Sequence, residues 1–251
     1  MRLFSLAFLL AAALWLAACA AQPQPPDPQA IVDQAIAAHG GEHLHHAIVE
    51  FDFRGKHFKI TRDGGVFQYE RLYTDSTGSV REVLNNDDLY REVNGERVTL
   101  EEKARLKMEE DVNSVVYFAL LPFPLNDPAV QKKYLGTATI AEEPYHKIEI
   151  TFRQEGGGRD YQDRFIYWIH QETSTVDYLS YFYYTNVTGS RFREAYNVRT
   201  VGGVRFADHH NYKSDTLRVD NVERYDELVG QMPLVSDIIL ENITVTPLEG
   251  S

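Results

Sequence analysis

The sequence predicts an α+β domain made mostly of antiparallel β-structure. Runs of alternating apolar and polar residues recur along most of the chain, separated by glycine, asparagine and aspartate. Two other segments carry apolar residues at helical spacing. The 251 residues include 15 Tyr and 13 Phe, many of them in the alternating runs, and aromatic residues favour strands. We therefore expect at least eight strands and two principal helices, near residues 29–39 and 101–120.

The first element is a short amphipathic helix at residues 29–39. Asp27 and Pro28 can cap and begin it, and Gly40 with Gly41 can end it. Its apolar residues are spaced to form one face: Ile31, Val32, Ala35, Ile36 and Ala38. We expect this face to pack against the sheet.

An antiparallel meander follows this helix. Residues 47–60 alternate with period two, and the apolar side of this run is Val49, Phe51 and Phe53. A tight turn at residues 63–65 leads into a second strand at residues 66–73. Turn residues at 85–88 and 94–95 predict two or three further short strands.

The second helix is expected at residues 101–120. Residues 99–102 form a capping-box pattern, the apolar content rises toward Leu121, and the prolines of residues 122–124 end the helix. Later strands are expected at residues 134–141, 145–153, 163–169, 176–185, 190–200, 204–213 and 236–247. No repeat or internal linker interrupts this pattern, so we expect a single β-rich domain at residues 29–248.

Residues 1–18 have the pattern of a secretory signal. Arg2 precedes an apolar run that is too short to remain as a membrane span, and small residues then lead to Cys19, the only cysteine in the chain. A plain secretory signal with an incidental cysteine, or a short buried helix, would also contain such a run.

The four residues that end at this cysteine resemble the lipobox of bacterial lipoproteins: Leu16-Ala17-Ala18-Cys19. The resemblance implies cleavage before Cys19, lipid attachment to its thiol and anchoring in a membrane of the bacterial cell envelope. Residues 19–28 are rich in proline and would form a tether between the lipid and the domain. Because Ala20, rather than aspartate, follows the cysteine, the analogy implies the outer membrane.

The composition excludes several classes of function. The net charge is −12, and it becomes −13 once residues 1–18 and their single arginine are removed. Such a chain repels nucleic acid and anionic head groups, so neither is expected as a partner. If Cys19 is acylated, the folded part has no cysteine, which excludes thiol catalysis and zinc-thiolate or iron–sulfur chemistry. We expect no cofactor.

The chain also resembles periplasmic lipoprotein and lipid carriers of the LolA-like fold. The resemblance rests on a short helix that ends at residues 37–44 and leads into the first strand, and on an apolar helix that ends in Leu120-Leu121-Pro122-Phe123. It rests also on residues 165–169, which run toward a turn at 172–173. Taken as a whole, the chain is similar to uncharacterised envelope lipoproteins of Bacteroidetes-type bacteria. What the LolA-like resemblance implies is a strongly curved sheet or half-barrel wrapped around one or two helices, with an apolar concavity that accepts acyl chains.

A hydrophobic ligand site is the function that these features favour. Residues 178–184 carry large apolar side chains on both faces of one strand, so the sheet is either covered on both sides or covered on one side by a ligand. We expect the concave face to be lined by some of Phe51, Phe53, Val115, Phe118, Phe123, Trp168, Phe182 and Tyr184. The ligand would be a lipid, an acyl chain or a lipoprotein.

Other interpretations remain open at this point. Two histidine groups, at residues 39–46 and 209–210, could bind a metal or could be solvated surface, and an envelope hydrolase or metal-dependent enzyme has no further support. The arginines at residues 191–205 could hold a lipid head group or a carboxylate, or could form an exposed charged face. No catalytic or metal-binding residue can be named, because the sequence contains no nucleophile elbow, zinc-protease motif or phosphate-binding loop. A structural or partner-binding lipoprotein is the third alternative.

Overall fold

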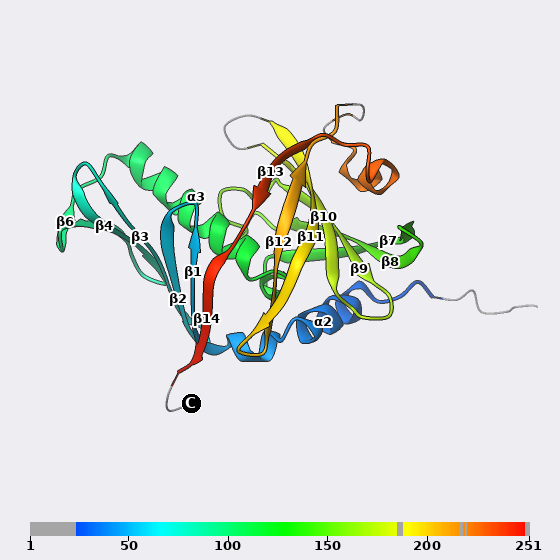
Figure 1. The fold of residues 1–251 in the computed structure, drawn as a ribbon, viewed down its shortest axis with the longest axis horizontal. Coiled ribbons are helices and arrows are strands. Elements are labelled where there is room, and N and C mark those ends of the chain that lie inside the picture. The colour runs from blue at the N-terminus through cyan, green and yellow to red at the C-terminus, as the bar shows by residue number, and fades with distance from the viewer. Residues whose placement is uncertain (1–23, 185–187, 216–217, 219, 249–251) are drawn as a thin grey trace, which may run out of the picture.

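The structure, a computed structural model, describes residues 24–184, 188–215, 218 and 220–248. Within these residues, 14 strands form two seven-stranded antiparallel sheets, and neither sheet closes into a barrel. Helix α3 (Glu102–Ala119) lies between the two sheets, and the shorter α2 (Pro28–Ala38) covers part of the second (Figure 1). The predicted fold class, α+β with mostly antiparallel strands curved around helices, is confirmed.

The first sheet contains the early meander. Its strands, in spatial order, are β14 (Glu241–Pro247), β1 (His46–Phe53), β2 (Lys56–Asp63), β3 (Val66–Asp75), β4 (Gly78–Asn85), β5 (Leu89–Val93) and β6 (Glu96–Val98). The alternation of β1 is as predicted, because Ala47, Val49 and Phe51 are buried while the residues between them are more exposed. The predicted run at residues 47–60 is, however, two strands. Arg54 and Gly55 adopt positive φ values of 50° and 71° and turn the chain back on itself.

The second sheet contains the later strands. In spatial order they are β13 (Leu234–Ile238), β12 (Val204–Tyr212), β11 (Gly189–Val201), β10 (Val176–Tyr183), β9 (Arg164–His170), β8 (Glu143–Phe152) and β7 (Val130–Ile140). The single last strand predicted at residues 236–247 is wrong. It is two strands, and the chain leaves the second sheet after β13 and joins the first sheet as β14. This crossing brings the two sheets together at one seam.

The two helices begin and end close to their predicted positions. Asp27 caps α2 by accepting a hydrogen bond from the backbone N–H of Gln29 at 2.9 Å. After α2, Gly40 adopts φ 73° and lies so close to the backbone of Gly203 that any Cβ at position 40 would clash. The capping box predicted at residues 99–102 is wrong, because the N-cap of α3 is Glu101, two residues later than Thr99, and it makes no side-chain cap.

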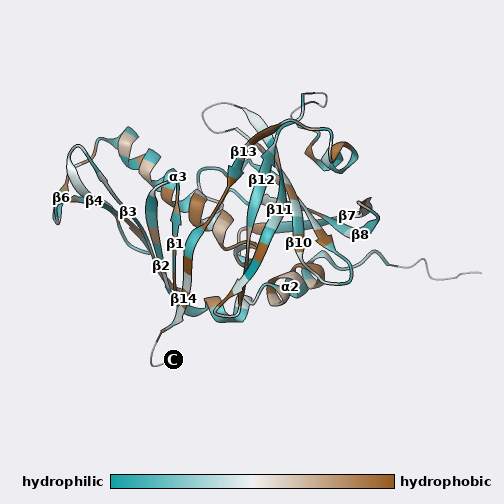
Figure 2. Ribbon diagram, in the orientation of Figure 1, coloured by the Kyte–Doolittle hydropathy of each residue, from teal (hydrophilic) through white to brown (hydrophobic). Residues whose placement is uncertain are grey.

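The apolar half of α3 is the half that lies between the sheets. Figure 2 shows hydrophobic residues gathered on this C-terminal half, whereas the N-terminal half is largely polar. Phe118 contacts Phe165 and Tyr181 of the second sheet, with ring centroids 6.1 and 5.3 Å apart. No helix within the described part of the chain is both long and apolar enough to cross a bilayer.

Protein covers both faces of the central strands of the second sheet. On one face α2 packs against strands β8 to β10, with Val32 and Ala35 fully buried. On the other face the 3₁₀ segment η4 (Val222–Leu228) packs over Trp168, and its Tyr225 is fully buried. The two-sided aromatic pattern of β10 is therefore explained by a sheet that is covered on both sides by its own chain.

Candidate functional site

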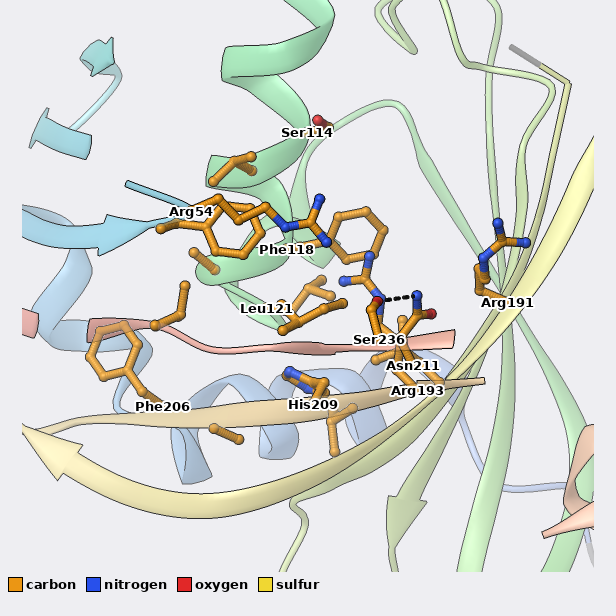
Figure 3. A pocket seen from close by; sticks show the side chains of 18 of the residues that line it. Arg54, Ser114, Phe118, Leu121, Arg191, Arg193, Phe206, His209, Asn211 and Ser236 are labelled. Carbon is orange, nitrogen blue, oxygen red and sulfur yellow. Dashed lines mark hydrogen bonds between the residues drawn. The ribbon is translucent and has the colours of Figure 1, made fainter. Parts of the chain in front are cut away.

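A cavity of about 430 Å³ lies at the seam between the two sheets. The C-terminal half of α3 forms one wall, and strands β10 to β13 form the opposite wall (Figure 3). The end of β1 and the Arg54 turn border it from the first sheet, and His39 borders it from the end of α2. Segments that are distant in the sequence therefore meet at this site.

Strand register places four residues of the cavity wall in one row across the second sheet. Leu179 of β10 pairs with Arg193 of β11, Arg193 pairs with Asn211 of β12, and Asn211 pairs with Ser236 of β13. Side chains at directly opposed positions point to the same face of a sheet. All four of these residues line the cavity, and Asn211 Nδ2 donates to Ser236 Oγ at 3.2 Å (Figure 3).

Four arginines line this cavity: Arg54, Arg191, Arg193 and Arg205. Arg205 forms an ion pair with Asp177, whose carboxylate oxygen is 3.1 Å from its Nη2. Within the described residues the other three have no carboxylate within 4.0 Å. No aspartate, glutamate or lysine is among the described residues that line the cavity. The cavity is therefore positively charged in a chain whose net charge is −12.

Arg193 is the most enclosed of the three arginines without an ion pair. Its side chain lies with the guanidinium carbon 3.7 Å from the centroid of the Phe118 ring, and Nη2 donates to the Tyr181 hydroxyl at 2.9 Å. The residue is 9% exposed, and its Nε has no hydrogen-bond partner within the described protein. Cation–π contact and one neutral acceptor compensate only part of the cost of burying this charge.

The two histidines of the cavity wall are neutral at physiological pH. Burial lowers the pKa of His39 to about 3, and the positive charge of Arg205 lowers it further. Burial also lowers the pKa of His209 to about 3, and Arg193 adds to this effect. His39 Nε2 accepts a hydrogen bond from the backbone N–H of Val176 at 3.1 Å, so the ring proton is on Nδ1.

Unpartnered polar atoms gather at this cavity. In the described protein, five buried side-chain nitrogen or oxygen atoms have no hydrogen-bond partner. Three of them belong to residues of the cavity wall: His39 Nδ1, Arg193 Nε and Asn211 Oδ1. Because buried polar groups are nearly always hydrogen-bonded, this concentration makes the cavity wall a candidate binding surface.

Three of the residues predicted to line a hydrophobic site do line the cavity: Phe53, Val115 and Phe118. Phe51 is fully buried and stacks on Phe58, with ring centroids 5.3 Å apart, in the core between the first sheet and α3. Phe123 follows α3 and packs at the edge of that same core, under the guanidinium of Arg62.

The remaining predicted residues lie away from the cavity. Trp168 and Phe182 belong to the core that η4 covers on the opposite face of the second sheet. Tyr184 is 52% exposed beyond the end of β10. Cys19 lies outside the described residues.

The two histidine groups meet only through His39 and His209, which both border the cavity. His46 and His210 are bound individually to aspartates, Asp63 and Asp237, each at 2.7 Å. His209 and His210 are adjacent on β12 and point to opposite faces, so only His209 reaches the cavity. The described residues contain no group of three or more histidine, cysteine, aspartate or glutamate side chains placed to hold a metal ion.

The sequence indicated three apolar residues of the cavity wall. It left two interpretations open for the arginines, a binding site or an exposed charged face. The usable signal was the spacing of Arg191 and Arg193, because residues two apart on a strand share a face. Nothing in the sequence indicated that this face turns toward α3. His39 and Asn211 could not be found, because only the pairing of strands and the end of α2 bring them to the cavity.

Comparisons with known proteins give one family and several structural likenesses. The chain is similar to a DUF1329 family protein of Desulfovibrio piger, with 12% identity, coverage of 87% of this chain and 93% of that chain, and a TM-score of 0.44. It is also similar to a LolA superfamily protein of Nitrosomonas europaea, with 9% identity, coverage of 90% and 96%, and a TM-score of 0.49. A search of the curated proteins gives no match. The model of a family of unknown function, DUF6503, matches residues 5–242. Since that match spans most of the sequence, the chain belongs to the DUF6503 family.

Proposed function

We propose that this protein is a lipid-anchored protein of the bacterial cell envelope that binds a hydrophobic ligand in the cavity between α3 and the second sheet. The observation that carries the proposal is the cavity itself. Its volume of about 430 Å³ falls in the range of roughly 300–1,000 Å³ that is usual for small-molecule sites.

The walls of the cavity suit an acyl chain. Phe118, Leu121 and Leu179 supply apolar surface from α3, the segment after it, and β10. Apolar side chains that border an open hollow lack van der Waals partners on one side, so a domain with a purely structural role would gain by filling the hollow with side chains. A binding site gives a reason to keep this volume open.

The proposed anchor is Cys19. Helix α2 begins at Pro28, about ten residues after Cys19. The proline-rich tether between them would keep the cavity within a few tens of ångströms of the lipid surface. Acylation at this position predicts that the full chain incorporates labelled palmitate and that Cys19→Ser does not. Equal incorporation by the variant would show that the anchor is placed wrongly.

Photo-crosslinking tests the ligand site itself. The full chain, in the membranes of its expression host, is incubated with two diazirine probes that carry the same sixteen-carbon chain, one ending in a carboxylate and the other in an alcohol. We expect at least one probe to label peptides from residues 114–121 or 204–211, and excess unlabelled ligand to suppress this labelling. Labelling that is not suppressed, or that falls outside the cavity walls, refutes the proposal.

A pair of matched substitutions controls for general effects of added bulk. Ala207 lies on the cavity wall, whereas Ala138 packs against the core on the opposite face of the second sheet. We expect Ala207→Phe to abolish the suppressible labelling and Ala138→Phe to retain it. Thermal unfolding of both variants checks that each is folded under the labelling conditions.

A further inference from the structure

We propose that the ligand is an anionic amphiphile whose carboxylate or phosphate head is bound by Arg193, with Arg191 and Arg54 beside it, and whose acyl chain lies along α3. This inference rests on the proposed function, because it names the class of ligand for the same cavity. Four lines of evidence carry it: the charge of the wall, the environment of Arg193, the arrangement of polar and apolar surface, and the neutrality of the histidines.

The charge of the cavity wall is unbalanced. Of its four arginines only Arg205 has a carboxylate partner among the described residues, and no acidic side chain from that part of the protein reaches the wall. The other buried arginine of the described residues, Arg71, pairs closely with Glu82, its Nε lying 2.5 Å from the carboxylate. A cation-lined wall without its own anions is complementary to an anionic ligand.

The guanidinium of Arg193 is oriented to bind such a head group. A guanidinium has five N–H donors in a planar fork that fits a carboxylate or phosphate through two parallel hydrogen bonds. In the described protein Arg193 donates to one neutral hydroxyl and leaves Nε without a partner. Phe118 and Tyr181 hold the group by cation–π contact, with the guanidinium carbon 3.7 and 5.1 Å from their ring centroids. The fork is thus oriented while part of its hydrogen-bonding capacity stays free.

The polar and apolar surfaces are arranged for a head and a tail. Figure 3 shows the Arg54 and Arg193 side chains close to Phe118 and Leu121, and Arg191 farther away on β11. A head group at Arg193 would place the attached chain directly beside these apolar side chains. A neutral hydrocarbon would occupy the same apolar surface but would leave the buried arginine without a counter-charge, which is costly.

The neutral histidines are consistent with this assignment. His209 and His39 add no positive charge to the wall at physiological pH, so the attraction to an anion comes from the arginines alone. His39 Nδ1 is buried and has no hydrogen-bond partner within the described protein. We therefore expect binding to change little between pH 6 and 8, where neither histidine titrates.

The acidic net charge of the chain does not oppose this ligand. Charges farther away than about 8 Å are largely screened at physiological ionic strength, whereas charges that meet inside an enclosed cavity are screened much less. The expectation that a net charge of −12 disfavours anionic head groups applies to the outer surface. It does not apply to this cavity, whose described wall has the opposite sign.

The paired probes test the inference separately from the proposed function. We expect half-maximal labelling of the full chain at a concentration at least tenfold lower for the carboxylate probe than for the alcohol probe. Unlabelled palmitate and lysophosphatidate identify which anionic head competes better, and stronger competition by either one than by hexadecanol supports the inference. Equal labelling by both probes overturns it and leaves the hydrophobic site intact, whereas no suppressible labelling overturns the site as well.

The variant Arg193→Met isolates the head-group contact. It removes the charge and keeps an unbranched chain over Phe118, so we expect the preference for the carboxylate probe to fall at least tenfold and alcohol labelling to persist. Arg97→Met is the matched control, because Arg97 also stacks on an aromatic ring, Tyr90, at 3.6 Å but lies on β6 away from the cavity. An unchanged carboxylate preference in folded Arg193→Met protein refutes the assignment. A purely structural role for Arg193 would lower labelling by both probes equally.

Discussion

Substituting Asn211 by aspartate supplies Arg193 with a counter-ion from within the protein. The two residues are opposed in register on β11 and β12, and both border the cavity. The change replaces one amide nitrogen by oxygen, so the packing is conserved. Ser236, which accepts from Asn211, can donate its hydroxyl proton to the new carboxylate instead.

The size of the effect follows from the distance between the strands. Opposed side chains on antiparallel strands have Cβ atoms about 5 Å apart, and the guanidinium lies farther out, so the charges would be about 6–8 Å apart. At an effective dielectric constant of about 20 they attract by about 2–3 kcal/mol. Burial of the carboxylate at a position that is 8% exposed costs several kcal/mol when no cation is near. We therefore expect Asn211→Asp alone to change the free energy of unfolding by less than about 1 kcal/mol, because the two terms nearly cancel.

A double-mutant cycle measures the attraction directly. The four proteins are the parent chain, Arg193→Met, Asn211→Asp and the double variant, each unfolded in urea and followed by the fluorescence of Trp168, which is fully buried. We expect Asn211→Asp to be about 2–3 kcal/mol more costly in the Arg193→Met background. The same single substitution should weaken labelling by the carboxylate probe at least tenfold, because the new carboxylate occupies the guanidinium.

Two results would refute this reasoning. A coupling energy below about 0.5 kcal/mol would mean that the guanidinium at position 193 does not face position 211 as an uncompensated charge. Unimpaired binding of the carboxylate probe by folded Asn211→Asp protein would mean that the anion is bound elsewhere.

Two further predictions concern stability. Glu82 is fully buried and accepts from Arg71 and Arg91, each at 2.5 Å, so Glu82→Gln should lower the free energy of unfolding by about 3–5 kcal/mol. The neighbouring Glu92→Gln, whose partner Arg81 is partly exposed, should cost less than about 1 kcal/mol in the same urea titration, and equal losses would contradict the argument. Burial, partly offset by a hydrogen bond from the Tyr184 N–H and increased by nearby acids, raises the pKa of Asp163 to about 7. Between about pH 4 and 7 the folded state therefore keeps a proton that the unfolded state loses, so stability falls as the pH rises through this window. Asp163→Asn should raise the midpoint of thermal unfolding at pH 8 and leave it unchanged near pH 4; the same shift at both values would exclude titration of this group as the cause.

Local patterns in the sequence were sufficient for most of the elements. Apolar spacing and flanking residues predicted both helices to within one or two residues of α2 and α3. Period-two alternation gave the buried face of β1, and glycine, asparagine and aspartate marked most of the turns. The missed turn at Arg54 and Gly55 shows the limit. The apolar positions change phase there, from Phe53 to Phe58, but arginine is unusual at a positive φ and did not mark the turn.

The division of the strands between two sheets was decided by the tertiary structure alone. The sequence predicts one strand at residues 236–247, and pairing with β12 on one side and with β1 on the other divides this segment between β13 and β14. The same pairing explains the aromatic residues of β10, since η4 covers a face that the sequence left to either protein or ligand. Alternation reports that a face is buried, and it carries no information on what buries it.

The position of the polar residues in the cavity likewise depends on how distant strands pair. The sequence by itself determined the fold class, the two helices and an apolar wall that includes Phe53, Val115 and Phe118. It could not show that Leu179, Arg193, Asn211 and Ser236 form one row, because strand pairing joins positions that are many residues apart and each strand is compatible with several registers. Only the folded chain turns this row toward α3, and that orientation places Arg191 and Arg193 on the wall of the cavity for which we propose an anionic ligand.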